Sequence, residues 1–286
     1  MTNKVVELFG HAASRRDLNW AQTIANQTCE FTGRRCYKTR KSDSTIAIGT
    51  CTVNYVQEGE MGAVIICPTR LIQRRQIFLD CAHLLTSHEI GNELHLLSEV
   101  SIPGGKVDFV LISVRDGIVR DFVGIELQTL DTTGTVWPER QRLLAELRVP
   151  RLDNAESVTK SFGMNWKMTS KTILVQMHHK IQTFEHLNKK LVLVVQDKLL
   201  NYMTREFDFG HLSSPAVIGD SLHLHSYGLA AEADGDYRLT LRSRLGTDAA
   251  GIARCLGLQA EARVGLDVIL QILQRRVNRE TLFSPV

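Results

Sequence analysis

The chain has 286 residues, of which 43% are hydrophobic and 23% are charged, and its formal net charge is +3. That length allows one or two domains with a sizeable core, and the small positive charge permits a polyanionic partner without requiring one. No apolar run approaches the roughly 18 residues of a membrane helix, and the N-terminus has no apolar signal core with a small-residue cleavage site. We therefore expect a soluble, cytoplasmic protein with no membrane partner.

The first predicted unit, residues 1–68, contains a turn-rich segment with four of the six cysteines. Thiols that stay reduced and cluster in sequence favour a metal over disulfides, and a tetrahedral thiolate site would suit Zn or Fe. The spacing, C-x6-C-x14-C-x15-C, lacks the paired C-x2-C of common zinc sites, so four unrelated small core residues are the alternative. The four candidates are Cys29, Cys36, Cys51 and Cys67, whereas Cys81 and Cys255 are better explained as core residues.

The second predicted unit, residues 69–215, begins with a helix over 69–88 that carries a rough 3.6-residue apolar stripe. Three strands follow in "ELHLLSEVSIP", "KVDFVLISVR" and "IVRDFVGIELQTL", and Asp116-Gly117 joins the last two as a hairpin. A helix is expected over 170–188, and "KLVLVVQD" then reads as a buried strand. Continuous apolar strands predict an α/β fold in which a central mixed sheet is flanked by helices.

The third predicted unit, residues 216–286, is a C-terminal extension that serves packing or dimerisation. A strand is expected over 237–243. The stretch "AEARVGLDVILQILQRRV" (260–277) predicts an amphipathic helix with basic residues in its last turn, as the helix dipole favours.

Acidic residues fall where the strands of the second unit could converge. Asp108 lies near the start of one strand and Glu126 lies in the next, with Gln128 two residues later on the same face. An Asp and a Glu on adjacent strands can hold Mg²⁺ through oxygen ligands. The bound ion can then activate a water and neutralise charge on a scissile phosphate. Glu99, in "SEVSIP", is a further acidic candidate.

The pattern Asp…Glu-x-Lys on a strand hairpin resembles the PD-(D/E)xK nuclease core, except that Gln128 stands in the Lys position. The amino-acid sequence around these motifs points to one family more specifically. "CEF…C…GTCTVNY…VIICPTR" followed by "VDFVLI…GIELQTLDTTGT" is similar to the NotI-type restriction endonucleases across roughly residues 25–200, including the Glu-x-Gln variant of that family.

The resemblance implies a type II restriction endonuclease, a homodimer that uses Mg²⁺ to cut double-stranded DNA at a specific site. It places the active site on Asp108, Glu126 and Gln128, with Glu99 matching the upstream acidic residue of the family. It also implies a structural four-cysteine metal site, with iron as the family's ion, in a small N-terminal element.

Two other functions remain open. A DNA-binding protein on a nuclease scaffold could have lost activity, with Gln128 as the mark of decay. A repair or modification-dependent nuclease could require altered bases. The intact pair Asp108 and Glu126 argues against the first, and the sequence shows no evident aromatic cage for the second.

Overall fold

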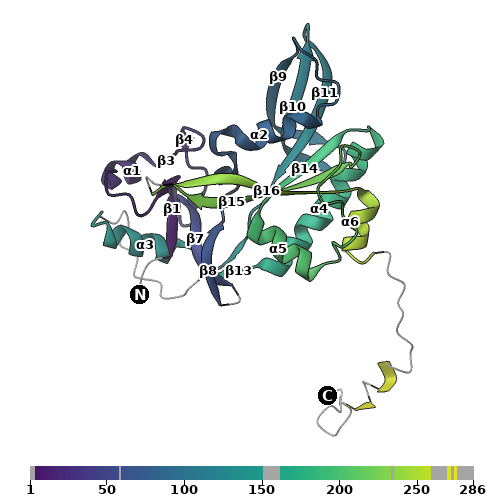
Figure 1. Cartoon of the computed structure of the whole chain (residues 1–286). Helices are drawn as coiled ribbons and strands as arrows, with labels where there is room; N and C mark the ends of the chain where they lie inside the picture. The colour runs from purple at the N-terminus through teal and green to yellow at the C-terminus, as the bar shows by residue number, and fades with distance from the viewer. Residues whose placement is uncertain are drawn as a thin grey trace.

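The computed structural model describes residues 4–57, 59–150, 162–232, 235–258, 269–271 and 274–275. Its centre is a six-stranded sheet in the order β16-β15-β14-β11-β10-β9 (Figure 1). The pairs β11–β14 and β14–β15 are parallel and the other three are antiparallel, so the sheet is mixed. Its strands are β9 (Glu93–Ile102), β10 (Gly105–Arg115), β11 (Ile118–Leu127), β14 (Lys190–Gln196), β15 (Leu222–Ala231) and β16 (Tyr237–Thr247).

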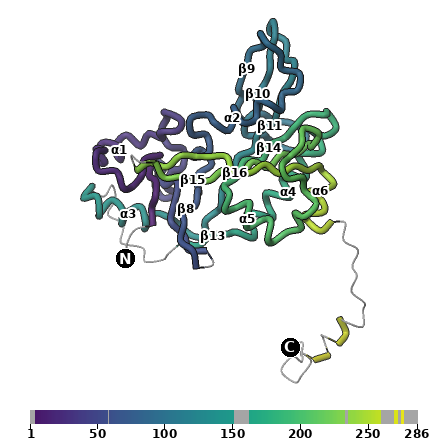
Figure 2. The backbone as a smooth tube through the Cα atoms, in the orientation of Figure 1, coloured from purple at the N-terminus to yellow at the C-terminus, as the bar shows by residue number. Residues whose placement is uncertain are grey.

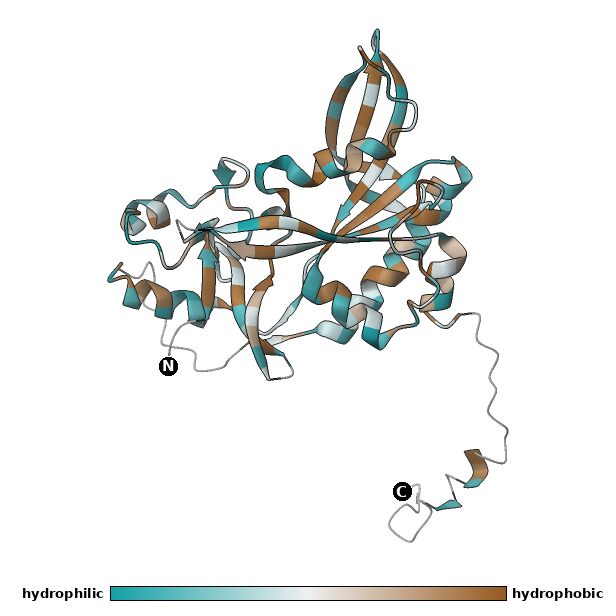
Figure 3. Ribbon diagram, viewed as in Figure 1, coloured by the Kyte–Doolittle hydropathy of each residue, from teal (hydrophilic) through white to brown (hydrophobic). Residues whose placement is uncertain are grey.

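Helices cover both faces of this sheet, because its central strands are apolar on both sides. Along β14, Leu191 and Leu193 join one core cluster while Val192 and Val194 join another. The first face packs against α4 (Trp166–His186), α5 (Asp197–Glu206) and α6 (Ala249–Cys255). The second packs against η1 (Pro68–Arg75), α2 (Gln76–Cys81) and η2 (Ala82–Leu84). Figure 3 shows hydrophobic residues running along the central strands. The predicted α/β fold with helices on both faces is confirmed.

The β10–β11 hairpin forms where the sequence predicts it. Asp116 and Gly117 both have positive φ, 53° and 72°, the conformation that a tight two-residue turn needs. In Figure 2 the ends of β9, β10 and β11 that lie beside the Asp116-Gly117 turn, called the far ends, project from the body of the molecule; the opposite ends are called the near ends. The near ends of the same strands lie within the body of the molecule.

The helix expected over 69–88 is broken into η1, α2 and η2. Arg74 and Arg75 have φ of 52° and 55°, and two left-handed residues end one helical segment and start another. The expected strand over 237–243 is part of β16. The expected helix over 260–277 lies for the most part outside the described residues.

The N-terminal part forms a second, four-stranded sheet in the order β2-β1-β7-β8. Its strands are β1 (Val5–Leu8), β2 (His11–Ala12), β7 (Thr50–Gln57) and β8 (Glu60–Ile65), and α1 (Trp20–Asn26) and α3 (Trp137–Glu146) contribute to its core. The remaining short strands are β3 (Thr28–Cys29), β4 (Arg34–Arg35), β5 (Thr39–Arg40), β6 (Asp43–Ala47), β12 (Thr132–Thr133) and β13 (Gly163–Met164).

A buried glutamine joins the two sheets. The Gln196 side chain, at the end of β14, accepts from the N–H of Ile65 at 2.8 Å and donates to the carbonyl of Ala63 at 2.8 Å. Both partners lie on β8, so the N-terminal sheet is fixed against the central one. The three-unit division at 68 and 215 stays a prediction, although β15 and β16 continue the central sheet past residue 215. Within the described ranges, no helix is both long and apolar enough to cross a membrane.

Candidate active site

Three acidic residues form a row across the near ends of β9, β10 and β11. Phe109 pairs with Ile125, so the next position places Asp108 opposite Glu126. The pairs of Val107 and Phe109 with β9 leave Asp108 opposite Glu99 on the other side. The hairpin register therefore brings these residues, far apart in sequence, to neighbouring positions on adjacent strands.

Asp108 and Glu126 belong to the sheet face that packs against α4. The flanking Ile125 and Leu127 point into the opposite core cluster, and side chains alternate along a strand. The N–H of Leu127 donates to Asp108 Oδ2 at 2.8 Å, which holds this carboxylate against the neighbouring strand. Asp108 is half-buried, and Glu126 is buried.

Burial dominates the electrostatics of the pair. The pKa of Glu126 is raised to about 7, mainly by burial; the nearby charge of Asp108 also raises it, and a hydrogen bond from Lys180 opposes the change. Burial also raises the pKa of Asp108, against the Leu127 N–H and the charge of Lys180. Two carboxyl groups that are both costly to ionise mark a place where a cation would be stabilised.

Glu99 and Gln128 lie at the margins of this row. Glu99 is exposed, forms an ion pair with Lys106, and has φ of 62°, an uncommon conformation for a non-glycine residue in a strand. Gln128 directly follows β11, is half-buried, and donates its backbone N–H to Val194 at 3.0 Å. The roles expected for both side chains stay predictions.

One residue of the site was missed in the sequence. Lys180, on α4, donates from Nζ to Glu126 Oε1 at 2.7 Å and to the carbonyl of Lys106 at 2.5 Å. A signal was present, because Lys180 falls on the apolar stripe of its helix, three residues after Met177 and four before Phe184. A charged residue at a stripe position is buried and needs a partner.

The four predicted cysteine ligands also come together. Cys29, Cys36, Cys51 and Cys67 line one cavity of about 20 Å³, room for an occupant the size of one water or ion. Cys51 and Cys67 share a hydrogen bond that lowers the pKa of the Cys67 thiol and raises that of Cys51, and the charge of Lys38 also lowers the Cys67 value. Burial raises the pKa of Cys36. All six cysteines are free thiols.

The described residues contain no group of three or more His, Cys, Asp or Glu side chains already placed to hold a metal ion. At both places the donor chemistry nevertheless fits a cation. Carboxylate oxygens suit Mg²⁺, and four thiols around one small cavity suit Zn or Fe. Binding at either place would require the side chains to converge further.

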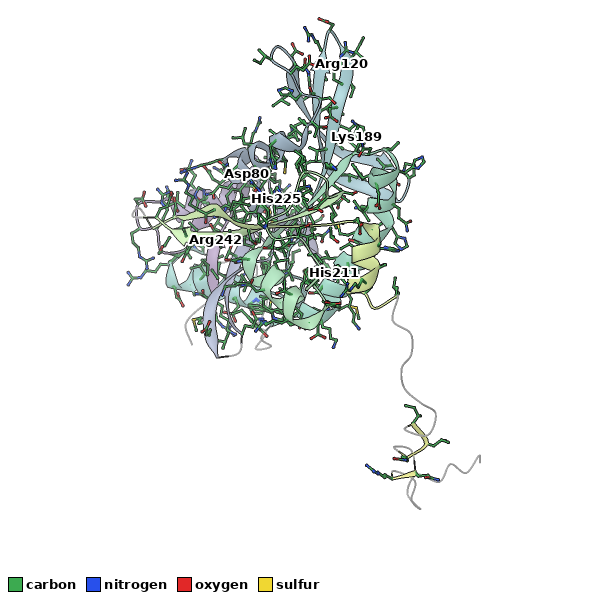
Figure 4. The ribbon with its side chains drawn as sticks, turned by 45° about the vertical axis from the view of Figure 1, so that its right-hand side comes forward. Asp80, Arg120, Lys189, His211, His225 and Arg242 are labelled. Carbon is green, nitrogen blue, oxygen red and sulfur yellow. The ribbon has the colours of Figure 1, made fainter. Side chains whose placement is uncertain are left out.

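Other buried titratable residues belong to the core. His223 and His225, on β15, are held neutral because burial lowers their pKa to about 4 and about 3. Tyr227 donates to Asp80 Oδ2 at 2.7 Å and so ties β15 to α2. Figure 4 shows Asp80 and His225 close to the centre of the molecule.

A family model described as "Restriction endonuclease NotI" matches residues 15–219, more than half of the chain. The match includes the acidic row, Lys180 and all four clustered cysteines. No curated protein matches the chain.

Proposed function

The chain belongs to the NotI restriction endonuclease family, and from that membership we propose that it is a Mg²⁺-dependent type II enzyme that hydrolyses double-stranded DNA at a specific sequence. The observation that carries the proposal is the row of carboxylates at Glu99, Asp108 and Glu126 on adjacent strands. The row supports a site of the PD-(D/E)xK type, proposed here in the variant with Gln128 at the Lys position.

Asp108 and Glu126 are the proposed Mg²⁺ ligands. When bound, the ion supplies charge neutralisation at the scissile phosphate and lowers the pKa of water. The chain contributes the geometry: the Leu127 N–H fixes Asp108, and Lys180 fixes Glu126. The uncharged Gln128 amide can accept from and donate to the attacking water. The oxygen of that water adds to phosphorus as the bond to the 3′ oxygen breaks, and the water's proton balances the one taken up by the departing 3′ oxygen.

The test is a digest of plasmid DNA of known sequence. Wild-type protein should give discrete fragments with Mg²⁺ and leave the plasmid whole in EDTA, and sequencing the ends gives the site and the stagger. DNA that is bound but never cut would instead support the inactive DNA-binding protein. Fragments obtained only from methylated DNA would support a modification-dependent nuclease.

The cysteine cavity is the second part of the proposal. Cys29, Cys36, Cys51 and Cys67 would hold one structural Fe or Zn ion, with every ligand position filled by protein. The location supports this role, because β3, β4 and the loop after them form little sheet of their own. A four-thiol clip would stabilise a segment that buries little apolar surface.

A further inference from the structure

Lys180 brings a buried positive charge to the acidic row from outside the sheet. Its ammonium group lies 2.7 Å from Glu126 Oε1, and the two side chains are 11% and 1% exposed. The same group donates to the Lys106 carbonyl at 2.5 Å, on β10. One side chain of α4 is therefore bonded to both strands that carry the proposed ligands.

The turn between β9 and β10 is built to allow this approach. Gly104 has φ of 93°, and a Cβ there would lie 2.7 Å from the carbonyl oxygen of His179. Gly105 has φ of 134°, and its Cβ would lie 3.3 Å from Cε of Lys180. One helical turn further on, Thr183 donates to the Pro103 carbonyl at 2.7 Å. Without side chains at the two glycines, the turn packs directly on α4 and Lys180 reaches into the site.

The charge of Lys180 has no substitute at the end of β11. Gln128 stands where the PD-(D/E)xK pattern has a lysine, and an amide carries no charge. Lys106 is ion-paired with the exposed Glu99. Among the described residues, Lys180 is the one cation bonded to the Glu126 carboxylate, and its charge also acts on Asp108.

Resting on the proposed function, we propose that Lys180 is a positioning residue of the nuclease site, which holds Glu126 in place and supplies from α4 the positive charge that the Gln128 variant lacks on its strand. If Lys180 and Glu126 formed only a structural ion pair, loss of the lysine would not specifically slow cleavage. The chain contains another ion pair that serves as a comparison. Lys189 lies 2.7 Å from Asp121, also on β11, with side chains 25% and 2% exposed. Figure 4 places Lys189 at the foot of the projecting strands.

The experiment compares Lys180→Met with the control Lys189→Met in the full-length protein. Single-turnover cleavage at saturating Mg²⁺ gives the rate, and calorimetric titration with Mn²⁺ in the absence of DNA gives the metal affinity. Lys180→Met should cut at least about 100-fold more slowly, yet bind Mn²⁺ as tightly as wild type or more tightly when the titration is run well above pH 7, where Glu126 is ionised in both proteins. Removing one cation leaves more negative charge for the other. Lys189→Met should leave both values within about threefold of wild type.

Returning the charge should return activity. Lys180→Arg should keep part of the rate. Gln128→Lys, added to Lys180→Met, should recover at least about tenfold because the cation is supplied from the strand side. If neither variant recovers activity, the charge argument is overturned. It is also overturned if Lys180→Met cuts within threefold of the wild-type rate. A third contrary result is a joint loss of Mn²⁺ affinity, cleavage and thermal stability in Lys180→Met that exceeds the loss in Lys189→Met.

These outcomes are distinct from failure of the proposed function. If wild-type protein leaves every DNA whole with Mg²⁺, the nuclease assignment fails by itself. The Mn²⁺ titration then tests the role of Lys180 by itself. Weaker Mn²⁺ binding in Lys180→Met than in wild type would show that the contact is merely structural and would overturn the inference.

Discussion

Asp108 and Glu126 place two carboxylates side by side. Loss of either charge should therefore weaken the stabilisation of the transition state. Asp108→Asn and Glu126→Gln nearly preserve shape while each removes one negative charge. We expect either change to slow cleavage more than about 100-fold, equivalent to about 2.7 kcal/mol. Sequence-specific DNA binding, measured by mobility shift with Ca²⁺, should persist. A wild-type cleavage rate in either variant would remove that residue from the site.

The raised pKa of Glu126 predicts a pH-dependent metal affinity. Burial lifts this pKa to about 7, so below that pH the free enzyme holds a proton that a cation must displace. As pH rises through 7 the carboxylate ionises and the cation meets less competition. Mn²⁺ titration at about pH 6 and about pH 8 should therefore show tighter binding at the higher pH. Equal affinities would indicate that Glu126 is already ionised throughout.

At the scale of elements, the packing of the β9–β10 turn on α4 requires a residue without a side chain at position 104. Gly104→Ala adds a Cβ 2.7 Å from the His179 carbonyl at a residue with φ of 93°. The change should push the turn from the helix, slow cleavage, and lower the free energy of unfolding by about 2–4 kcal/mol. Chemical denaturation and the cleavage rate measure the two effects.

Gly117→Ala is the matched control. Gly117 has φ of 72° in the β10–β11 turn, but no atom lies within 4 Å of the Cβ position. Only the backbone strain of about 1 kcal/mol applies there, and the turn lies at the far end of β10. If both variants were equally stable and equally active, contact between the turn and α4 would not matter for the site.

How much the sequence predicts depends on whether the determining signal is local. The β10–β11 hairpin and α4 were predicted because a two-residue turn and an apolar stripe can be seen within a few residues. β15 was not, because His223 and His225 occupy buried positions and interrupt the apolar pattern. Their burial depends on neighbours far away in sequence, and no local pattern contains that information.

The site shows the same limit. Asp108 and Glu126 could be placed together because a short hairpin fixes their register. Lys180 is 54 residues from Glu126, and a lysine on a helix ordinarily lies in solvent. Only the fold shows that the stripe containing Lys180 packs over the acidic row.

At the scale of the whole molecule, the cysteine cavity predicts a resident transition metal. Purified protein should contain about one Fe or Zn per chain, and excess Mg²⁺ should not displace it, because thiolates hold soft metals and Mg²⁺ prefers oxygen ligands. Elemental analysis gives the content. Replacing Cys29, Cys36, Cys51 or Cys67 with Ser should lower the metal content and the melting temperature.

Cys81 and Cys255 supply the controls for that measurement. Both are buried in core clusters away from the cavity, so Cys81→Ser and Cys255→Ser should leave the metal content unchanged. Protein that contains no transition metal after purification without chelators would rule out the four-cysteine site.

A palindromic duplex offers two equivalent scissile phosphates related by a two-fold axis, and the described part of one chain contains one acidic row. Cutting both strands in one encounter therefore needs two chains joined by a self-complementary interface. We expect a homodimer on DNA, whose binding weakens steeply with salt because each neutralised phosphate releases counterions. Sedimentation under cleaving conditions checks the stoichiometry. One chain per duplex would contradict the dimer and favour sequential nicking, visible as open-circular plasmid before the linear product.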